Sequence, residues 1–275
     1  MKLAFTKMHG LGNDFIVFDA PPDGPPSAET LRRLADRHTG IGFDQALMLE
    51  PPHREGTAVF YRVFNADGRE VEQCGNGARC IASIIGARRG HGPGLLVMDS
   101  TGGLVRARVL DDGLVSVAMG IPNFDPASLP FEASGEASVY PLAVGDRTIE
   151  IGAVSIGNPH AVIRVPSIAE APVDRLGPAI EHHPRFSKRT NVGFMEVVDA
   201  GHIRLRVHER GTGETRACGT GACGAVAVGR RHGLLGEDVN VDLPGGRLTV
   251  HWKGPGEPIW LTGPAEISYA GEVAI

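Results

Sequence analysis

The sequence predicts an α+β fold made of two similar halves, in which β-strands surround one apolar helix. Alternation of apolar and polar residues, which is typical of strands, dominates the 275-residue chain. Two fragments are near copies, CGNGARC at Cys74–Cys80 and CGTGAC at Cys218–Cys223, and their first cysteines lie 218 − 74 = 144 positions apart. Each fragment opens a helix of small and apolar residues, which needs burial on nearly all sides. A curved antiparallel sheet wrapped around each helix would supply that burial.

The first half contains strands before and after its cysteine-led helix. Alternation marks the strands, an apolar residue every third or fourth position marks the helices, and Asp111-Asp112-Gly113 supplies a turn. The predicted elements are a strand over Met1–Lys7, a helix over Ser27–His38, a strand over Thr57–Phe64, a helix over Gly75–Arg89 and a hairpin over Val105–Val117.

The second half repeats this arrangement. The predicted elements are a strand over Ala161–Val165, a helix over Val173–His182, a strand over Ile203–Val207, a helix over Gly219–His232 and a hairpin over Val239–Trp252 that turns at Pro244-Gly245-Gly246. Glycine and proline interrupt the pattern near Gly120–Asn123. We therefore expect an N-terminal domain over 1–120 and a C-terminal domain over 121–263.

Composition and charge exclude several functional classes. The chain is 42% hydrophobic and 21% charged, with a net charge of −5 and no basic run, so we expect no nucleic-acid partner. No apolar stretch approaches the roughly 20 residues of a membrane span, and the N-terminus lacks a signal-peptide pattern. A cytoplasmic protein with no membrane association is expected, its four cysteines being reduced thiols.

Cys74 and Cys218 are the candidate reactive groups. A cysteine at a helix start has its thiolate favoured by unpaired backbone N–H groups and the helix dipole. Two such cysteines in equivalent places suggest inversion of a carbon centre, with one sulfur removing a proton and the other returning one. The alternative is that each is a small buried hydrophobic residue. Cys80 and Cys223 fall inside the helices and are expected to serve packing, and the Cys-x5-Cys and Cys-x4-Cys spacings are not typical of structural zinc.

The glycines at 219–224 match the spacing of dinucleotide-binding turns, but that interpretation is not favoured. The preceding strand ends near Glu209-Arg210, and eight residues intervene, whereas the dinucleotide fingerprint follows its strand directly. We expect these glycines instead to let a small anion approach backbone N–H groups. An amino-acid carboxylate between two helix N-termini would also be stabilised as its α-carbon becomes a carbanion.

Polar side chains in turns complete the candidate site. Asn13 follows a strand, and Asn65 ends another, although a bare turn explains Asn65 as well. The remaining members are Asn158, His160, Asn191, Glu209 and Arg210. A carboxylate can take an ammonium group, and a guanidinium can take a carboxylate through two hydrogen bonds. Together these side chains predict a pocket for a small zwitterion.

The chain resembles diaminopimelate epimerases almost from end to end. The segments that carry the resemblance are MHGLGNDF at Met8–Phe15, GIGFDQ at Gly40–Gln45, NADG at Asn65–Gly68 leading to Cys74–Cys80, GNPH at Gly157–His160, TNVGF at Thr190–Phe194, and ERG at Glu209–Gly211 leading to Cys218–Cys223. His208 stands where relatives often have tyrosine, which puts little in doubt.

The resemblance implies interconversion of LL- and meso-2,6-diaminopimelate without pyridoxal phosphate, another cofactor or a metal, in lysine and peptidoglycan precursor biosynthesis. It also implies two pseudo-symmetric domains, each an antiparallel half-barrel sheet wrapped around a central helix, with the active site in the interdomain cleft. The C-terminal strand, within 264–275, is expected to return to the first domain. A cytoplasmic homodimer is expected.

The resemblance also assigns roles. Cys74 and Cys218 match the base and acid, and His160 and Glu209 match residues that tune the cysteine pKa values. The matched substrate contacts are Asn13, Gln45, Asn65, Gly75, Asn76, Asn158, Asn191, Glu209, Arg210, Gly219 and Thr220. Tyr269 matches a dimerisation position. The helix N-termini are expected to lower both cysteine pKa values from about 8.5, and the two thiols are expected to titrate as a coupled pair.

Other functions remain open at this point. A proline or hydroxyproline racemase shares the fold and the cysteine pair. It needs no site for a distal amino-acid group, so the four asparagines and Arg210 argue against this alternative. A phenazine-pathway isomerase uses a carboxylate in place of the two cysteines. A non-catalytic thiol-redox or metal-binding protein would also use four cysteines.

Overall fold

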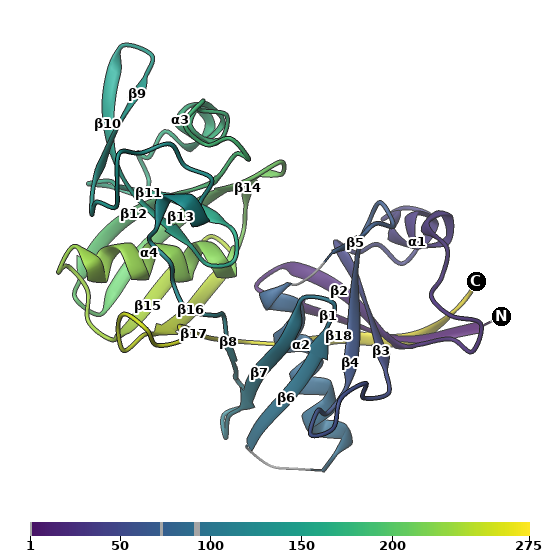
Figure 1. Ribbon diagram of the computed structural model, residues 1–275. Helices are drawn as coiled ribbons and strands as arrows, with labels where there is room; N and C mark the ends of the chain where they lie inside the picture. Colours follow the sequence, from purple (N-terminus) through teal and green to yellow (C-terminus); the bar gives the residue numbers. More distant parts are fainter. Residues whose placement is uncertain (1, 72–73, 91–93) are drawn as a thin grey trace. The chain divides into compact units, whose positions relative to one another are not determined.

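The computed structural model describes residues 2–71, 74–90 and 94–275, and the chain within it divides into two compact units (Figure 1). Unit 1 comprises Met1–Val117 and Thr262–Ile275, and unit 2 comprises Ala118–Leu261. The sequence predicted domains at 1–120 and 121–263, and their identity with these two units stays a prediction.

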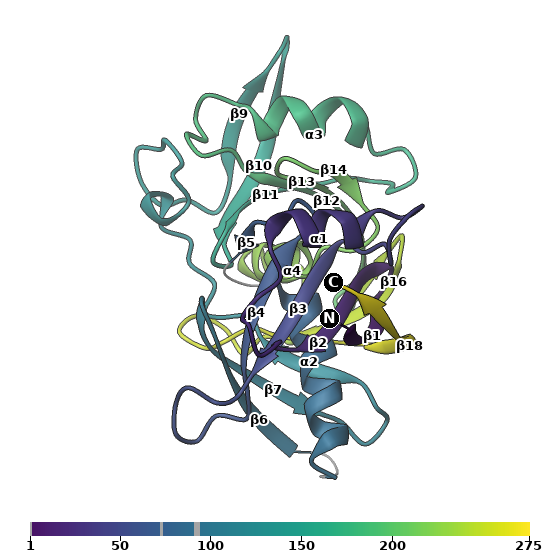
Figure 2. The ribbon, with the colours of Figure 1, turned by 90° about the vertical axis from the view of Figure 1, so that its right-hand side faces the viewer.

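Unit 1 is built mainly of strands. Its elements are β1 (Lys2–Gly10), β2 (Asn13–Asp19), α1 (Ala28–Ala35), β3 (Gln45–Glu50), β4 (Phe60–Asn65), β5 (Glu70–Val71), α2 (Gly75–Arg88), β6 (Gly94–Ser100), β7 (Gly103–Val109), β8 (Val115–Ala118) and β18 (Glu266–Ala274). β18 pairs antiparallel with β1, from Lys2↔Ala274 to His9↔Glu266. The two chain ends therefore lie in one sheet, as Figure 2 shows near the labels N and C.

Unit 2 is also built mainly of strands. Its elements are the short 3₁₀-helix η1 (Pro126–Ser128), β9 (Tyr140–Val144), β10 (Arg147–Ser155), β11 (Pro159–Arg164), α3 (Val173–Glu181), β12 (Asn191–Asp199), β13 (His202–Glu209), β14 (Gly213–Thr215), α4 (Gly219–Arg231), β15 (Asp238–Leu243), β16 (Gly246–His251) and β17 (Trp260–Gly263). The predicted turn at Pro244-Gly245-Gly246 connects β15 and β16, as expected from the sequence.

The two units repeat one order of elements. The series β1-β2-α1-β3-β4-β5-α2-β6-β7 in unit 1 corresponds to β10-β11-α3-β12-β13-β14-α4-β15-β16 in unit 2. The pairings correspond as well: β2–β3 and β4–β6 are parallel in unit 1, and β11–β12 and β13–β15 are parallel in unit 2. The near-copied cysteine fragments therefore belong to a repeat of the whole topology.

The predicted α+β fold is confirmed, but the sheets are mixed, not purely antiparallel. The β2–β3 and β11–β12 pairs are parallel because α1 and α3 carry the chain back to the end of the sheet where the preceding strand began, which is the crossover that parallel strands require. The sequence pattern identified α1 and α3 as helices, but not β3 and β12 as the strands that follow them. The strand predicted over Thr57–Phe64 begins later, at Phe60, and the predicted helices end within three residues of their observed ends.

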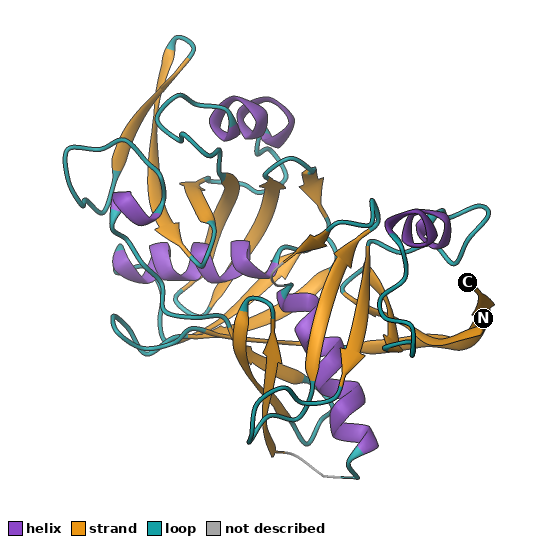
Figure 3. Ribbon diagram, turned by 45° about the vertical axis from the view of Figure 1, so that its right-hand side comes forward, coloured by secondary structure: helices purple, strands orange, loops and turns teal. Residues whose placement is uncertain are grey.

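Each sheet is covered by helices on both faces. Ala46 and Met48 of β3 lie in one apolar cluster with Leu31 and Leu34 of α1, whereas Leu47, one residue along, lies beside Gly77 of α2. Successive strand residues point to opposite faces, so α1 and α2 cover opposite sides of the unit 1 sheet. α4 packs against β10–β13 and β16 in unit 2 (Figure 3).

Burial explains why the cysteine-led helices consist largely of small and apolar residues, with Asn76 and Arg79 of α2 as buried polar exceptions. On α4 the residues Ala222–Gly229 are all buried, and on α2 the run Asn76–Ala82 is buried. Close packing requires glycine on the facing strand: a Cβ at Gly152 of β10 would lie 2.3 Å from Val228 Cγ1. Cys80 and Cys223 are fully buried within these helices, which agrees with their expected packing role. Burial raises the pKa of the Cys80 thiol to about 12.

Candidate active site

The polar residues of unit 1 gather at one edge of its sheet. β2 and β3 run parallel with Phe15 opposite Gln45, and β4 runs antiparallel to β3 with Asn65 opposite Gln45. Two strands therefore begin, and one ends, at the same edge. A two-residue turn, Leu11-Gly12, has φ of 57° and 88° and brings the chain from β1 to Asn13 at that edge.

Cys74 joins this edge as the N-cap of α2. Its backbone is extended (φ −140°, ψ 114°), and the N–H of Gly77 donates to Cys74 Sγ at 3.5 Å. Asn76 Nδ2 donates to Asn13 Oδ1 at 3.2 Å, and the same oxygen lies 4.0 Å from Cys74 Sγ. The structure thus brings together three predicted site residues, and Gly75 lies between two of them in the first turn of the helix.

Two carbonyl oxygens at this edge lack a donor. Gln45 Nε2 donates to Asn65 Oδ1 at 2.8 Å, which occupies the amide nitrogen of Gln45. Gln45 Oε1 and Asn76 Oδ1 are buried and have no hydrogen-bond partner among the residues that the structure describes. Buried acceptors without a donor are costly and rare in native proteins. A bound molecule that carries N–H groups would satisfy them.

Unit 2 repeats the arrangement. β11 and β12 run parallel with His160 opposite Asn191, and β13 runs antiparallel to β12 with His208 opposite Val192. Two strands again begin, and one ends, at the same edge, so His160, Asn191 and Glu209 are neighbours. The fold therefore positions the predicted residues of both units by the same topological rule.

Cys218 is the N-cap of α4 and starts a chain of polar contacts. The N–H of Gly221 donates to Cys218 Sγ at 3.4 Å, and Thr220 Oγ1 lies 3.6 Å from the sulfur. Asn158 Nδ2 donates to Thr220 Oγ1 at 3.4 Å, and Asn158 Oδ1 lies 2.9 Å from His160 Nε2. The side chains of Asn158 and Thr220 therefore connect His160 to Cys218.

The expected lowering of both cysteine pKa values is wrong for Cys218. Burial and the negative charge of Glu209 raise the pKa of Cys218 well above its ordinary value, against the hydrogen bonds from Thr220 and Gly221. The helix N-terminus is present, as predicted, but complete burial of the sulfur outweighs it. Cys218 is therefore held as a thiol in this state. That Glu209 tunes the cysteine pKa values during the reaction stays a prediction.

His160 is a buried neutral ring. Burial, assisted by the positive charge of Arg210, lowers the pKa of His160 to about 3. The ring packs tightly on α4, because a Cβ at Gly224 would lie 3.2 Å from His160 Cβ. At neutral pH the imidazole carries no charge, so its contribution near Cys218 is through hydrogen bonding and not through a positive charge.

Acid should destabilise the protein through His160. In the unfolded chain a histidine titrates near a pKa of about 6.5, so below that pH the unfolded state binds a proton that the buried ring does not. The stability contributed by neutral His160 is fully present above about pH 7 and is lost progressively toward about pH 3. Between pH 7 and pH 5 the expected loss is about 2 kcal/mol in the free energy of unfolding.

Urea unfolding at these two pH values tests this expectation. His160→Gln should shrink the difference between pH 7 and pH 5 by about 2 kcal/mol. His182→Gln, which changes an exposed histidine of the same unit, is the matched control and should leave the difference as it is. An undiminished difference in His160→Gln would contradict a neutral buried ring.

The predicted site residue Asn191 and one residue that the sequence did not single out, Glu181, hold the turn that carries Arg210. The backbone N–H of Arg210 donates to Asn191 Oδ1 at 2.9 Å, and Asn191 Nδ2 donates to Pro159 O at 3.0 Å. Glu181 of α3 accepts from the backbone N–H of Gly211 at 2.8 Å and contacts His208 Nε2 at 2.8 Å. Asn191 therefore braces the turn that carries Arg210. Nothing in the pattern around Glu181 indicated this role, because it depends on α3 packing on β13.

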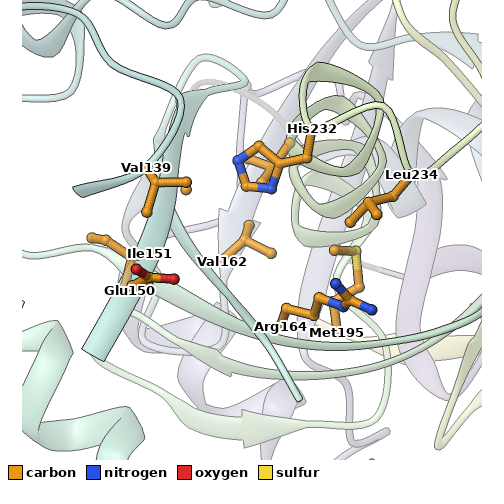
Figure 4. A pocket seen from close by; sticks show the side chains of 10 residues that line it. Val139, Glu150, Ile151, Val162, Arg164, Met195, His232 and Leu234 are labelled. Atoms are coloured by element: carbon orange, nitrogen blue, oxygen red, sulfur yellow. The ribbon is translucent and has the colours of Figure 1, made fainter. Parts of the chain in front are cut away.

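Other features of the chain lie apart from these two edges. Tyr269 lies on β18, half exposed, with its ring edge-on to Phe5 at 6.0 Å. A surface hollow of about 240 Å³ in unit 2 lies between β10–β12 and the C-terminal part of α4, and none of the predicted site residues lines it (Figure 4). Across the described ranges, no group of three His, Cys, Asp or Glu side chains is placed to hold a metal ion. Within the same ranges, no helix is long and apolar enough to cross a membrane.

Two solved structures share this fold. A hydroxyproline epimerase from Agrobacterium vitis, with bound trans-4-hydroxy-L-proline, matches with a TM-score of 0.71 at 16% identity, covering 100% of this chain and 93% of that one. A phenazine biosynthesis protein from Bacillus anthracis matches with a TM-score of 0.73 at 18% identity, over 100% of both chains. At this identity the likeness concerns the fold alone.

Sequence comparisons are more specific. A family model described as diaminopimelate epimerase matches residues 5–124 and 152–268. Among curated relatives of that name, the protein from Alkalilimnicola ehrlichii is 52% identical over 278 residues, covering 100% of both chains. The one from Nitrosomonas eutropha is 54% identical over 278 residues, covering 99% of both. These matches confirm the resemblance carried by the sequence motifs, and the chain belongs to the diaminopimelate epimerase family, a family of isomerases.

Proposed function

We propose that this protein interconverts LL- and meso-2,6-diaminopimelate, with Cys74 and Cys218 as base and acid on opposite faces of one α-carbon. The observation that carries the proposal is the repeat itself. Each cysteine caps a buried helix at the sheet edge where the polar side chains of its unit gather. Membership of the epimerase family supports the same reaction.

The two sulfurs would exchange roles between directions. In one direction a thiolate takes the α-proton, the electron pair stays on the α-carbon and its carboxylate, and the opposite thiol gives its proton to the other face. The free enzyme must therefore hold one thiol and one thiolate. We propose that the two sulfurs share a single proton and titrate as a coupled pair, so that either one can start as the base. His160 and Glu209, which both belong to unit 2, would adjust the pKa values of the cysteine pair.

The substrate carboxylate would bind at the helix starts. The backbone N–H groups of Gly75-Asn76 and Gly219-Thr220 lie in the first turns of α2 and α4. Unpaired N–H groups and the helix dipole favour an anion there, and the stabilisation grows as negative charge spreads from the α-carbon to the carboxylate. No cofactor or metal takes part in this proposal, so exclusion of water by a closing motion between domains must contribute as well.

The remaining polar residues would hold the distal amino-acid group and the ammonium groups. Gln45 and Asn76 each offer a buried oxygen that needs a donor. The proposed contacts of the distal group are Asn65, Asn158, Asn191 and Arg210. Asn13 and Glu209 are proposed as further substrate contacts. Such a set suits a molecule that is an amino acid at both ends. We further propose a place in lysine and peptidoglycan precursor biosynthesis, a cytoplasmic location, and a homodimer to which Tyr269 contributes.

The proposal predicts turnover of diaminopimelate by the purified chain alone. After dialysis against EDTA and without pyridoxal phosphate, chromatography that separates the isomers should show LL-diaminopimelate converting to the meso form, and the reverse. Proline, lysine and glutamate at equal concentration should not be racemised, because the polar residues for the distal group would be left unpaired. Comparable activity on proline would assign the chain to racemisation instead and cancel the distal site.

A further inference from the structure

A cluster of four charged side chains supports the edge where Asn13 lies. Lys7 of β1 and Arg37, which follows α1, both contact Asp14: Lys7 Nζ lies 2.6 Å from Asp14 Oδ2, and Arg37 reaches both carboxylate oxygens at 2.7 and 2.9 Å. Arg37 also reaches Asp44 Oδ1 at 2.9 Å. Burial acts to raise the pKa of Asp14, but its bonds to Arg37 and Lys7 outweigh burial and hold the pKa well below its usual range.

The two carboxylates of this cluster tie the starts of β2 and β3 together. The backbone N–H of Asp14 donates to Asp44 Oδ2 at 3.1 Å, and that of Asp44 donates to Asp14 Oδ1 at 3.0 Å. Asp44 stands directly before Gln45, and Asp14 directly after Asn13, so the tie fixes two residues of the candidate site. Because Arg37 donates to both carboxylates, neither can turn away without losing a charged partner.

Asp44 also decides which end of the Asn13 amide faces Cys74. Asn13 Nδ2 donates to Asp44 Oδ2 at 2.8 Å. An ionised carboxylate accepts hydrogen bonds and donates none, so the amide nitrogen must lie on this side. Asn13 Oδ1 is then directed to the opposite side, where it accepts from Asn76 Nδ2 and lies 4.0 Å from Cys74 Sγ. Without Asp44, rotation of the amide by half a turn would place NH₂ beside the sulfur.

We infer that Asp44 is a positioning residue, which holds the Asn13 amide with its oxygen toward Cys74 and so presents one fixed pattern of hydrogen-bonding groups to the substrate. The inference rests on the proposed function, in which Asn13 contacts the substrate beside Cys74. Asp44 is half exposed and acts through Asn13, not by touching the reacting atoms. Misplacing a group that orients substrate costs up to about 100-fold in rate. We expect Asp44→Ala to lower kcat/KM by about 10- to 100-fold.

A double-mutant cycle separates this role from general support of the fold. Asn13→Ala, Asp44→Ala and the double variant are compared with the unchanged chain for kcat and KM on diaminopimelate. If Asp44 acts through Asn13, its replacement should cost little further once Asn13 is alanine. Losses that multiply would overturn the inference. Asp19→Ala, which removes another carboxylate of β2 paired with Arg88, is the matched control and should keep the activity of the unchanged chain.

A second measurement does not depend on turnover. In ¹H–¹⁵N spectra of the asparagine side chains, the Asn13 NH₂ signal, assigned by its loss in Asn13→Ala, should show slow exchange because it is bound to a carboxylate. That protection should disappear in Asp44→Ala and persist in Asp19→Ala. An Asn13 signal unchanged by Asp44→Ala would overturn the inference even in an inactive preparation. Failure of the proposed function would instead appear as an unchanged chain that does not turn over diaminopimelate although its Asn13 amide is protected.

Discussion

Cys218→Ala and Cys74→Ala should each abolish epimerisation of both isomers. In the proposed mechanism one sulfur removes the α-proton and the other returns one, so neither direction can be completed with a single thiol. A positioned acid or base contributes about 10²- to 10⁴-fold, so loss of one should lower kcat by at least about 100-fold. Cys218→Ser should be equally inactive, because a hydroxyl keeps the size and the bond from Gly221 but not the acidity of a thiol.

The chain offers matched controls for these variants. Cys80→Ala and Cys223→Ala remove buried cysteines from the same two helices without touching the helix starts. Both should keep activity within about 10-fold, apart from the instability that a buried cavity causes. Turnover of a Cys74 or Cys218 variant at a rate near that of these controls would contradict the two-base mechanism.

Arg210→Met should cause the next largest loss of kcat/KM on diaminopimelate, because Arg210 is proposed to bind the distal group of the substrate. Removing a buried partner of a charged ligand group costs about 2–5 kcal/mol, which corresponds to about 30- to 5,000-fold in kcat/KM. The fold should persist, because the backbone N–H of Arg210, which methionine retains, is what bonds Asn191. In the structure the guanidinium donates to Lys188 O at 3.1 Å, a bond that does not join separate strands.

Arg204→Met is the control for Arg210→Met. Arg204 lies on β13, the strand that leads to Arg210, and pairs with Glu196 at 2.6 Å on an exposed surface, where such pairs contribute little. Urea unfolding midpoints of both variants should stay near that of the unchanged chain, while diaminopimelate turnover falls only in Arg210→Met. Equal turnover by the two variants would remove Arg210 from the proposed substrate site.

Much of the architecture could be predicted because its signals are local. The helices led by Cys74 and Cys218 are marked by the glycines that follow each cysteine, and Asp111-Asp112-Gly113 and Pro244-Gly245-Gly246 mark hairpins whose strands the structure contains. The parallel pairing of β2 with β3 was not predictable in this way. It depends on the end of the sheet to which α1 carries the chain back. Neither the hydrophobic period of the sequence nor its turn residues carry information on strand direction.

The electrostatics of the site show the same limit. The N-cap positions of both cysteines could be inferred, but the direction of the Cys218 pKa shift could not, because it reflects how completely packing buries the sulfur beside Glu209. Asp44 lies inside the GIGFDQ motif at Gly40–Gln45, yet its bond to Asn13 joins residues 31 positions apart. Such contacts exist only once β2 and β3 are paired, so composition and spacing do not reveal them.

The most direct test of the two-base claim is the reaction in D₂O. Each isomer is incubated separately with the purified chain, and deuterium at the α-carbon is measured by mass spectrometry in both the remaining substrate and the product at early times. Two separate acid and base groups predict that the product carries solvent deuterium, while the unreacted substrate keeps its proton. Deuterium that enters the unreacted substrate with retained configuration, as fast as product forms, would show a single exchanging base and contradict the roles of Cys74 and Cys218.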